Sequence, residues 1–236
     1  MRKKVKILGV RFDAITQKDC LKQIENWAHG DAQHYITTPN PEIVLKAHKD
    51  KEFKEILNQS SLNVADGTGT ILVSRLKHGK VLPERITGTD LMKQVIEKSS
   101  AKIFLLGAAP GVAEKVRDKF SNTNITGCFA GSPNEKDSTL AVEKINNSKA
   151  QILFVAFGAP KQEKWIAENL KKLKTVRVAI GVGGAFDFHA GKIKRAPARM
   201  RKLGLEWLYR LFKQPSRIKR IYNAVIKFPI TALFNR

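Results

Sequence analysis

The chain has 236 residues, of which 42% are hydrophobic, and it carries 43 Lys or Arg against 21 Asp or Glu, a formal net charge of +22. A chain of this length can bury a substantial core, and the apolar fraction excludes wholesale disorder. So large a positive charge predicts polyanionic partners, which are nucleic acid, anionic lipid or phosphorylated substrates. The two cysteines, Cys20 and Cys128, form no CxxC pair and indicate neither a disulfide framework nor a metal cluster.

The basic N-terminus, residues 1–4, is followed by an alternating apolar pattern that is too short for the apolar segment of a signal peptide. No apolar run approaches the length of a transmembrane helix. We therefore expect a cytoplasmic, reducing location, with any membrane contact peripheral.

Short β-rich runs alternate with helical patterns along most of the chain. In chain order, the pattern predicts strands over residues 5–10, 34–37, 62–64, 102–107, 125–129, 152–157 and 176–181. It predicts helices over residues 18–27, 41–57, 69–76, 88–98, 111–120, 138–147 and 161–171. Several strands are continuously apolar, which is typical of a parallel sheet covered on both faces. The predicted fold is α/β, a Rossmann-like, mostly parallel sheet with flanking helices, and sites in such folds form at the carboxyl ends of strands.

Residues 192–236 contain thirteen Lys or Arg and only one acidic residue, Glu206, with large apolar side chains between the charges. Two helices are expected after the break at Ala196-Pro197, one over residues 198–212 and a second beginning near Pro215. We therefore divide the chain into an α/β core, 1–195, and a basic amphipathic helical appendage, 196–236. Its charge and apolar stripe suit the cytoplasmic face of an anionic membrane.

Two of the predicted strand-to-helix loops carry polar residues that allow either a structural or a chemical role. Asn40 with Pro41 after it is typical of a helix N-cap, and the pattern favours that role over contact with a substrate. Asp66 lies among glycines, where a plain turn and a general base at the end of a strand are equally good interpretations.

Three further loops are rich in glycine. Residues 158–163 and 181–187 follow the two most apolar strands, and together they would form a nucleotide pocket in which Asp187 accepts hydrogen bonds from a uracil N–H or a ribose hydroxyl. Turns and helix caps explain these loops equally well. Residues 107–112 lack the spacing of a P-loop or a GxGxxG motif and predict a tight turn whose helix N-terminus could face a phosphate.

The chain has no pair of aspartates separated by one residue, the metal clamp of many sugar-nucleotide transferases. Its histidines have no metal-ligand spacing. We therefore expect no metal site and no cofactor. A departing diphosphate would then be stabilised by Arg or Lys.

Taken together and in order, seven motifs resemble the WecG/TagA/CpsF glycosyltransferases over nearly the whole chain. These motifs are residues 38–40, 65–69, 83–88, 158–165, 181–187, 194–197 and 203–210. The resemblance is greatest to the branch that transfers N-acetylmannosamine (ManNAc) in wall teichoic acid synthesis. It implies an inverting, metal-independent transfer from UDP-ManNAc to the 4-hydroxyl of N-acetylglucosamine (GlcNAc) on undecaprenyl diphosphate, giving a β-1,4 linkage. Donors vary within the family, so UDP-ManNAcA or a UDP-hexose in another surface polysaccharide pathway is the alternative.

The resemblance also assigns roles to individual residues. It implies that Asp66 is the general base and that Thr38 lines the catalytic pocket with it. It further implies that the appendage closes over the pocket at the membrane and brings arginines to the diphosphate. The substrate-binding residues expected on this basis are Asn40, Arg85, Gln162, Asp187, Arg210, Arg217 and Arg220.

The expected partners are a UDP-sugar donor, a lipid-diphosphate-linked GlcNAc acceptor and the anionic inner face of the plasma membrane, and a homo-oligomer is allowed. A basic nucleic-acid-binding module is the alternative from another class, and the absence of RNP, KH and helix-turn-helix patterns disfavours it. We therefore expect no nucleic-acid partner. A nucleotide-binding oxidoreductase is disfavoured because no complete GxGxxG follows a strand.

Overall fold

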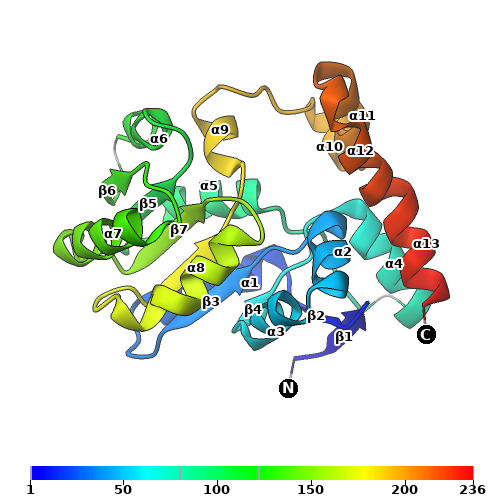
Figure 1. The fold of residues 1–236 in the computed structure, drawn as a ribbon, viewed down its shortest axis with the longest axis horizontal. Coiled ribbons are helices and arrows are strands. Elements are labelled where there is room, and N and C mark those ends of the chain that lie inside the picture. Colours follow the sequence, from blue (N-terminus) through cyan, green and yellow to red (C-terminus); the bar gives the residue numbers. More distant parts are fainter. Residues whose placement is uncertain (1, 80, 122, 236) are drawn as a thin grey trace.

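A six-stranded parallel sheet forms the centre of the protein, in a computed structural model that describes residues 2–79, 81–121 and 123–235 (Figure 1). Its strands lie in the order β4-β3-β8-β7-β5-β6, and every neighbouring pair is parallel. Their bounds are β3 His34–Thr37, β4 Leu62–Asn63, β5 Ile103–Gly107, β6 Ile125–Phe129, β7 Ile152–Ala156 and β8 Val178–Gly181. The predicted α/β class is confirmed.

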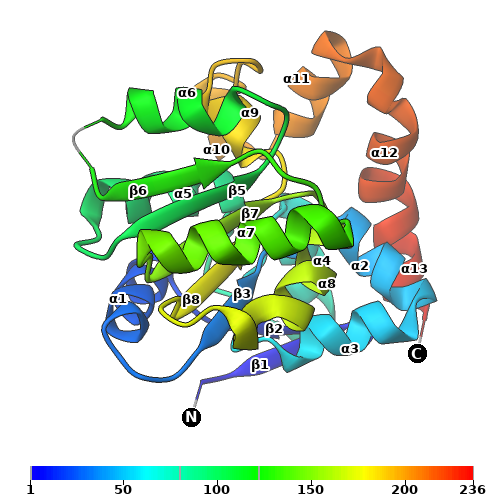
Figure 2. The ribbon, with the colours of Figure 1, turned by 60° about the vertical axis from the view of Figure 1, so that its left-hand side comes forward.

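Helices cover both faces of this sheet (Figure 2). One face packs against α1 (Gln17–Ala28), α5 (Gly88–Lys98), α6 (Val112–Lys119) and α9 (Ala185–His189). The other packs against α7 (Glu135–Ser148) and α8 (Lys161–Asn169), which continues into the short helix η1 (Leu170–Lys172). Because β5 and β7 are buried on both sides, their sequences are continuously apolar rather than alternating.

A second apolar core lies beside the sheet. It joins the hairpin β1 (Lys4–Ile7) and β2 (Val10–Asp13) to the helices α2 (Pro41–Lys49), α3 (Lys51–Gln59) and α4 (Thr68–His78). The C-terminal helix α13 (Phe228–Phe234) completes this core with two side chains, Phe228 and Ala232, which are buried. The end of the appendage is thus packed into the body of the protein, and the division at residue 195 stays a prediction.

Two N-terminal predictions differ from the structure. The strand expected over residues 5–10 is instead a hairpin, whose turn at Leu8 and Gly9 has positive φ angles of 50° and 82°. The helix expected over residues 41–57 is interrupted at Asp50, whose carboxylate accepts a hydrogen bond from the backbone N–H of Phe53 at 3.0 Å. Asp50 therefore ends α2 and begins α3 as its N-cap.

The first predicted appendage helix is also divided. It consists of α10 (Ala198–Lys202) and α11 (Glu206–Lys213), separated at Gly204, whose φ is 75°. A Cβ atom at Gly204 would lie 2.5 Å from the Cγ2 of Thr68, at the start of α4. The close approach of the appendage to α4 at this point therefore requires glycine.

A second run of helices begins at Pro215, as predicted. It passes through η2 (Pro215–Arg217), α12 (Ile218–Tyr222) and the π-helical η3 (Asn223–Lys227) into α13. Among the described residues, no helix is both long and apolar enough to span a membrane.

Candidate functional site

Four polar loops meet at one edge of the sheet. Residues 38–40 follow β3, residues 64–67 follow β4, residues 182–184 follow β8 and residues 157–160 follow β7. Since β4, β3, β8 and β7 are neighbours in that order and all run in parallel, their carboxyl ends are adjacent. The structure thus brings together the loops in which the sequence placed Thr38, Asn40, Asp66, Gln162 and Asp187.

Asp66 lies in the loop that follows β4, the outermost strand at this end of the sheet. Its backbone N–H donates to the carbonyl of Pro39 at 3.1 Å, and its Oδ2 accepts the N–H of Gly88, at the start of α5, at 3.4 Å. Burial raises the pKa of Asp66 to about 6, against the lowering effects of Arg85, of the Gly88 N–H and of Arg210. A carboxylate with this pKa is ionised at neutral pH and still basic enough to accept a proton.

Thr38 and Asn40 support the loop that faces Asp66. The Thr38 hydroxyl is buried and donates to the carbonyl of Gly181 at 3.1 Å, which ties β3 to β8. Asn40 is the N-cap of α2, since its Oδ1 accepts the N–H of Ile43 at 3.0 Å. The capping role favoured for Asn40 is therefore present, and contact of either residue with a substrate stays a prediction.

Gln162 connects two of the glycine loops. Its Oε1 accepts the N–H of Gly158 at 3.1 Å and the N–H of Gly183 at 2.9 Å, while its Nε2 donates to Oε1 of Glu163 at 2.7 Å. The side chain is buried, and Gly181 packs against it so closely that a Cβ there would lie 2.8 Å from Nε2. Gln162 thus fixes the spacing of the loops after β7 and β8, and its contact with a nucleotide-sugar stays a prediction.

Glu163 was not among the candidate residues, yet it is fully buried behind this edge. Burial raises the pKa of Glu163 to about 7, although the hydrogen bond from Gln162 and the nearby Lys46 lower it. Its Oε2 has no hydrogen-bond partner among the described residues. The Glu163 side chain therefore holds the Gln162 amide in place from the core side. The only feature of the sequence that pointed to a role for Glu163 was its place in the motif of residues 158–165.

Glu163→Gln should flatten the dependence of stability on pH. The folded-state pKa of about 7 lies above the ordinary value of 4.5, so between these values the folded protein retains a proton that the unfolded chain releases. Wild-type stability should therefore fall as pH rises from about 4.5 to 7, by on the order of 3 kcal/mol or less. Urea unfolding of both proteins at pH 5 and pH 8 measures this loss, and an equal loss in the variant would contradict it.

Arg85 and Arg210 approach Asp66 from two different segments. Arg85 precedes α5 and lies 3.9 Å from the carboxylate of Glu206, while its Nη2 donates to the carbonyl of Arg201 at 3.3 Å. Arg210 of α11 donates to Glu206 at 2.9 Å, and its guanidinium lies over the ring of Phe188, 4.8 Å from the ring centre. The single acidic residue of the appendage is thus buried between two arginines of the site.

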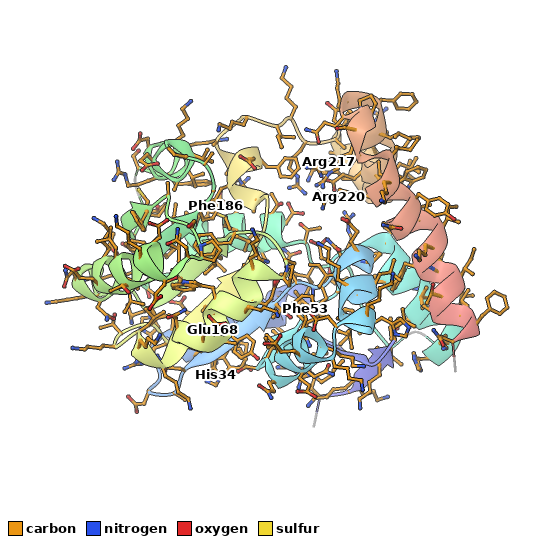
Figure 3. The ribbon with its side chains drawn as sticks, in the orientation of Figure 1. His34, Phe53, Glu168, Phe186, Arg217 and Arg220 are labelled. Carbon is orange, nitrogen blue, oxygen red and sulfur yellow. The ribbon has the colours of Figure 1, made fainter. Side chains whose placement is uncertain are left out.

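Arg217 and Arg220 extend from the C-terminal helices toward α9 and α2 (Figure 3). Arg220 binds Glu42, at the start of α2, with Nε 3.0 Å from both carboxylate oxygens and Nη2 2.8 Å from Oε2. Burial and the positive charges of Arg220 and Arg210 lower the pKa of Arg217, opposed by Glu42 and Asp187. Arg217 therefore lies among other cations, an environment that favours an anion.

Asp187 lies on α9 and is half-buried, close enough to Arg217 for their charges to interact. Among the described residues, no group of three or more His, Cys, Asp or Glu is placed to hold a metal ion.

Two surface hollows lie away from this edge. One, of about 290 Å³, is lined by His29, Lys149 and Arg177 at the amino ends of the strands, and the other, of about 480 Å³, includes Gln17 and Lys98.

The segment between the sheet and the appendage is fastened to α5. The guanidinium of Arg195 forms a two-pronged pair with Asp90, which also accepts from the hydroxyl of Thr87, the N-cap of α5. Burial disfavours the charged form of Asp90, but Arg195 and Thr87 outweigh it and hold the pKa of Asp90 at about 2. The pairing of Arg195, from the motif of residues 194–197, with Asp90 fixes the N-terminus of α5, which presents Gly88 to Asp66.

Comparison with known proteins identifies the family of the chain. Residues 5–236 match the family described as the WecG/TagA/CpsF glycosyl transferases. A Bacillus subtilis (strain 168) protein is 38% identical over 205 residues, which cover 84% of this chain and 78% of the relative. A Staphylococcus aureus (strain MRSA252) protein is 37% identical over 232 residues, 94% of this chain and 90% of the relative. Both are named N-acetylglucosaminyldiphosphoundecaprenol N-acetyl-beta-D-mannosaminyltransferase. The chain therefore belongs to the WecG/TagA/CpsF family of glycosyltransferases.

Proposed function

We propose that the protein transfers N-acetylmannosamine from UDP-ManNAc to the 4-hydroxyl of the GlcNAc carried on undecaprenyl diphosphate. The transfer inverts the anomeric centre, requires no metal and forms the β-1,4 linkage unit of wall teichoic acid. The observation that carries this proposal is the position of Asp66, a carboxylate with a raised pKa at the carboxyl edge of the sheet, beside a cluster of arginines.

The acceptor hydroxyl needs a negatively charged base, and the departing diphosphate needs positive charge. Asp66 takes the proton from the acceptor 4-hydroxyl as that oxygen attacks the anomeric carbon of the donor. The bond from the anomeric carbon to the β-phosphate oxygen breaks, and its electron pair leaves with UDP. Arg217 and the neighbouring Arg210, together with Arg85 beside Asp66, stabilise the negative charge that develops on that diphosphate.

The acceptor lipid requires the enzyme to work at a membrane surface. We assign the contact to the basic appendage, on the cytoplasmic face of the plasma membrane, because residues 203–235 combine exposed apolar side chains with many cations and a single acid, which is buried. Arg220 links this appendage to α2 through Glu42. This ion pair would thus help to couple binding of the appendage to lipid with closure of the site.

Release of UDP from UDP-ManNAc tests the proposal. We expect turnover only when a short-chain lipid-diphosphate-GlcNAc acceptor is present, and we expect the rate to persist in EDTA. Loss of activity in EDTA that added Mg²⁺ restores would contradict the metal-independent mechanism. The stereochemistry of the new linkage, read by NMR of the product, tests inversion.

The alternative within the family is a different donor in another surface polysaccharide pathway. Preferential turnover of UDP-ManNAcA or a UDP-hexose with the same acceptor would support it. Salt-sensitive binding to duplex DNA, together with no affinity for UDP, would instead support the basic nucleic-acid-binding module.

A further inference from the structure

Large apolar side chains are exposed on the outer surface of the C-terminal helices and on α4. In the C-terminal run, Ile218, Tyr222, Ile226 and Ile230 recur at four-residue intervals, and each is about half exposed. Phe234, at the end of the stripe, is 82% exposed. On α4, Leu72 and Leu76 are 54% and 63% exposed. Exposed apolar side chains are therefore not confined to the appendage, because a helix of the predicted core carries them as well.

Helices α4 and α13 lie side by side and run in the same direction (Figure 1). At the start of α4, Gly69 lies against Ala224 and Phe228. At its end, Lys77 donates through Nζ to the carbonyls of Ala232 at 2.8 Å and Asn235 at 3.0 Å. Helix α4 and the C-terminal helices thus pack on one buried core, and each carries exposed apolar side chains.

The charges around this surface are almost all positive. Helix α4 contains no acidic residue, and the only one in residues 203–235 is Glu206, which is buried. Arg75, Lys213, Lys219 and Lys227 are exposed near the apolar side chains. A surface that is apolar and basic without an exposed acid matches anionic lipid. A second copy of the chain would bring an equally basic surface and be repelled.

We infer that α4 is part of the membrane contact, with Leu72 and Leu76 entering the lipid interface beside the C-terminal stripe. This inference rests on the proposed function. Helix α4 begins at Thr68, two residues after Asp66. At 1.5 Å per residue, Leu72 and Leu76 lie about 6 Å and about 12 Å along the helix from Thr68. The helix thus holds the general base within reach of a sugar attached to a lipid headgroup.

The double variant Leu72→Gln/Leu76→Gln in the full chain tests this inference. Sedimentation with vesicles of phosphatidylcholine and 30% phosphatidylglycerol should show affinity reduced about tenfold or more, because both side chains lose their apolar burial in lipid. Turnover of a water-soluble short-chain acceptor should stay within about twofold of the wild type. Leu140→Gln on α7, where the leucine is 41% exposed, is the matched control and should bind vesicles normally.

A second variant, Ile226→Gln/Ile230→Gln, separates this inference from the proposed function. If it loses vesicle binding while the α4 variant retains it, the appendage alone contacts lipid and the inference is wrong. If both variants keep full vesicle binding, the apolar stripe is not the membrane contact at all, while glycosyl transfer is judged by UDP release. If the α4 variant instead changes only the mass of the protein in light scattering, the surface is an interface between copies, which also overturns the inference.

Discussion

Asp66→Asn should fold normally and lose activity by a factor of about 10²–10⁴, the usual contribution of one positioned base. The asparagine oxygen can still accept the Gly88 N–H that Oδ2 accepts at 3.4 Å, so the loop should keep its geometry. An amide cannot take the proton of the acceptor hydroxyl. UDP release with the short-chain acceptor measures the loss, and thermal unfolding measures the fold.

The pH dependence of kcat/KM is an independent test of Asp66 as the base. Because burial raises the pKa of Asp66 to about 6, the base is protonated and inactive below that pH, so kcat/KM should rise with pH and level off above about 6. Arg85 lowers the pKa of Asp66 and Glu206 raises it. The midpoint should therefore move up in Arg85→Gln and down in Glu206→Gln.

A matched substitution at an exposed carboxylate, Asp118→Asn on α6, should leave both the rate and the midpoint unchanged. Full activity in Asp66→Asn would remove Asp66 from the role of base. A midpoint that moves in the same direction in Arg85→Gln and Glu206→Gln would show that another group controls the pH profile.

The sheet could be predicted because local pattern and tertiary environment agree there. Strands β5 and β7 are buried on both faces, so their continuous apolar runs reveal both the strand and its cover. Helix α5 matched its predicted bounds because Thr87 and Asp90 form a local capping arrangement that the sequence contains. The break at Asp50 was missed because the apolar spacing continues across it, while one side-chain cap redirects the chain.

The site could be predicted as a set of loops but not as a set of contacts. Parallel strands bring the loops of Asp66 and Gln162 to one edge of the sheet, and this does not depend on the contacts of the two side chains. The direction of the Gln162 amide depends on Gly183, which is distant in sequence, and burial of Glu163 depends on how α8 packs. The pairing of Arg220 with Glu42 joins residues 178 positions apart, so no local pattern contains it.

Arg217→Ala should lower kcat by about 10²–10³, the usual effect of removing one preorganised donor to a developing anion, about 2.7–4 kcal/mol. Arg217 is held among Arg210 and Arg220, and burial already lowers its pKa, so an arriving diphosphate relieves the repulsion between these cations. UDP, as a product inhibitor, should also bind more weakly to this variant. Arg217→Lys should recover only part of the loss, because lysine keeps the charge but not the two-pronged geometry of the guanidinium.

Arg220→Ala should behave differently. Its guanidinium already pairs with Glu42, so its loss should release α12 from α2 and weaken vesicle-stimulated turnover more than turnover of the soluble acceptor. Lys219→Ala removes an exposed cation from the same helix and is the control for net charge. If Lys219→Ala lowers kcat as much as Arg217→Ala, overall charge rather than a placed donor stabilises the diphosphate. If Arg217→Ala keeps its kcat and its affinity for UDP, the leaving group departs toward Arg85 and Arg210 instead.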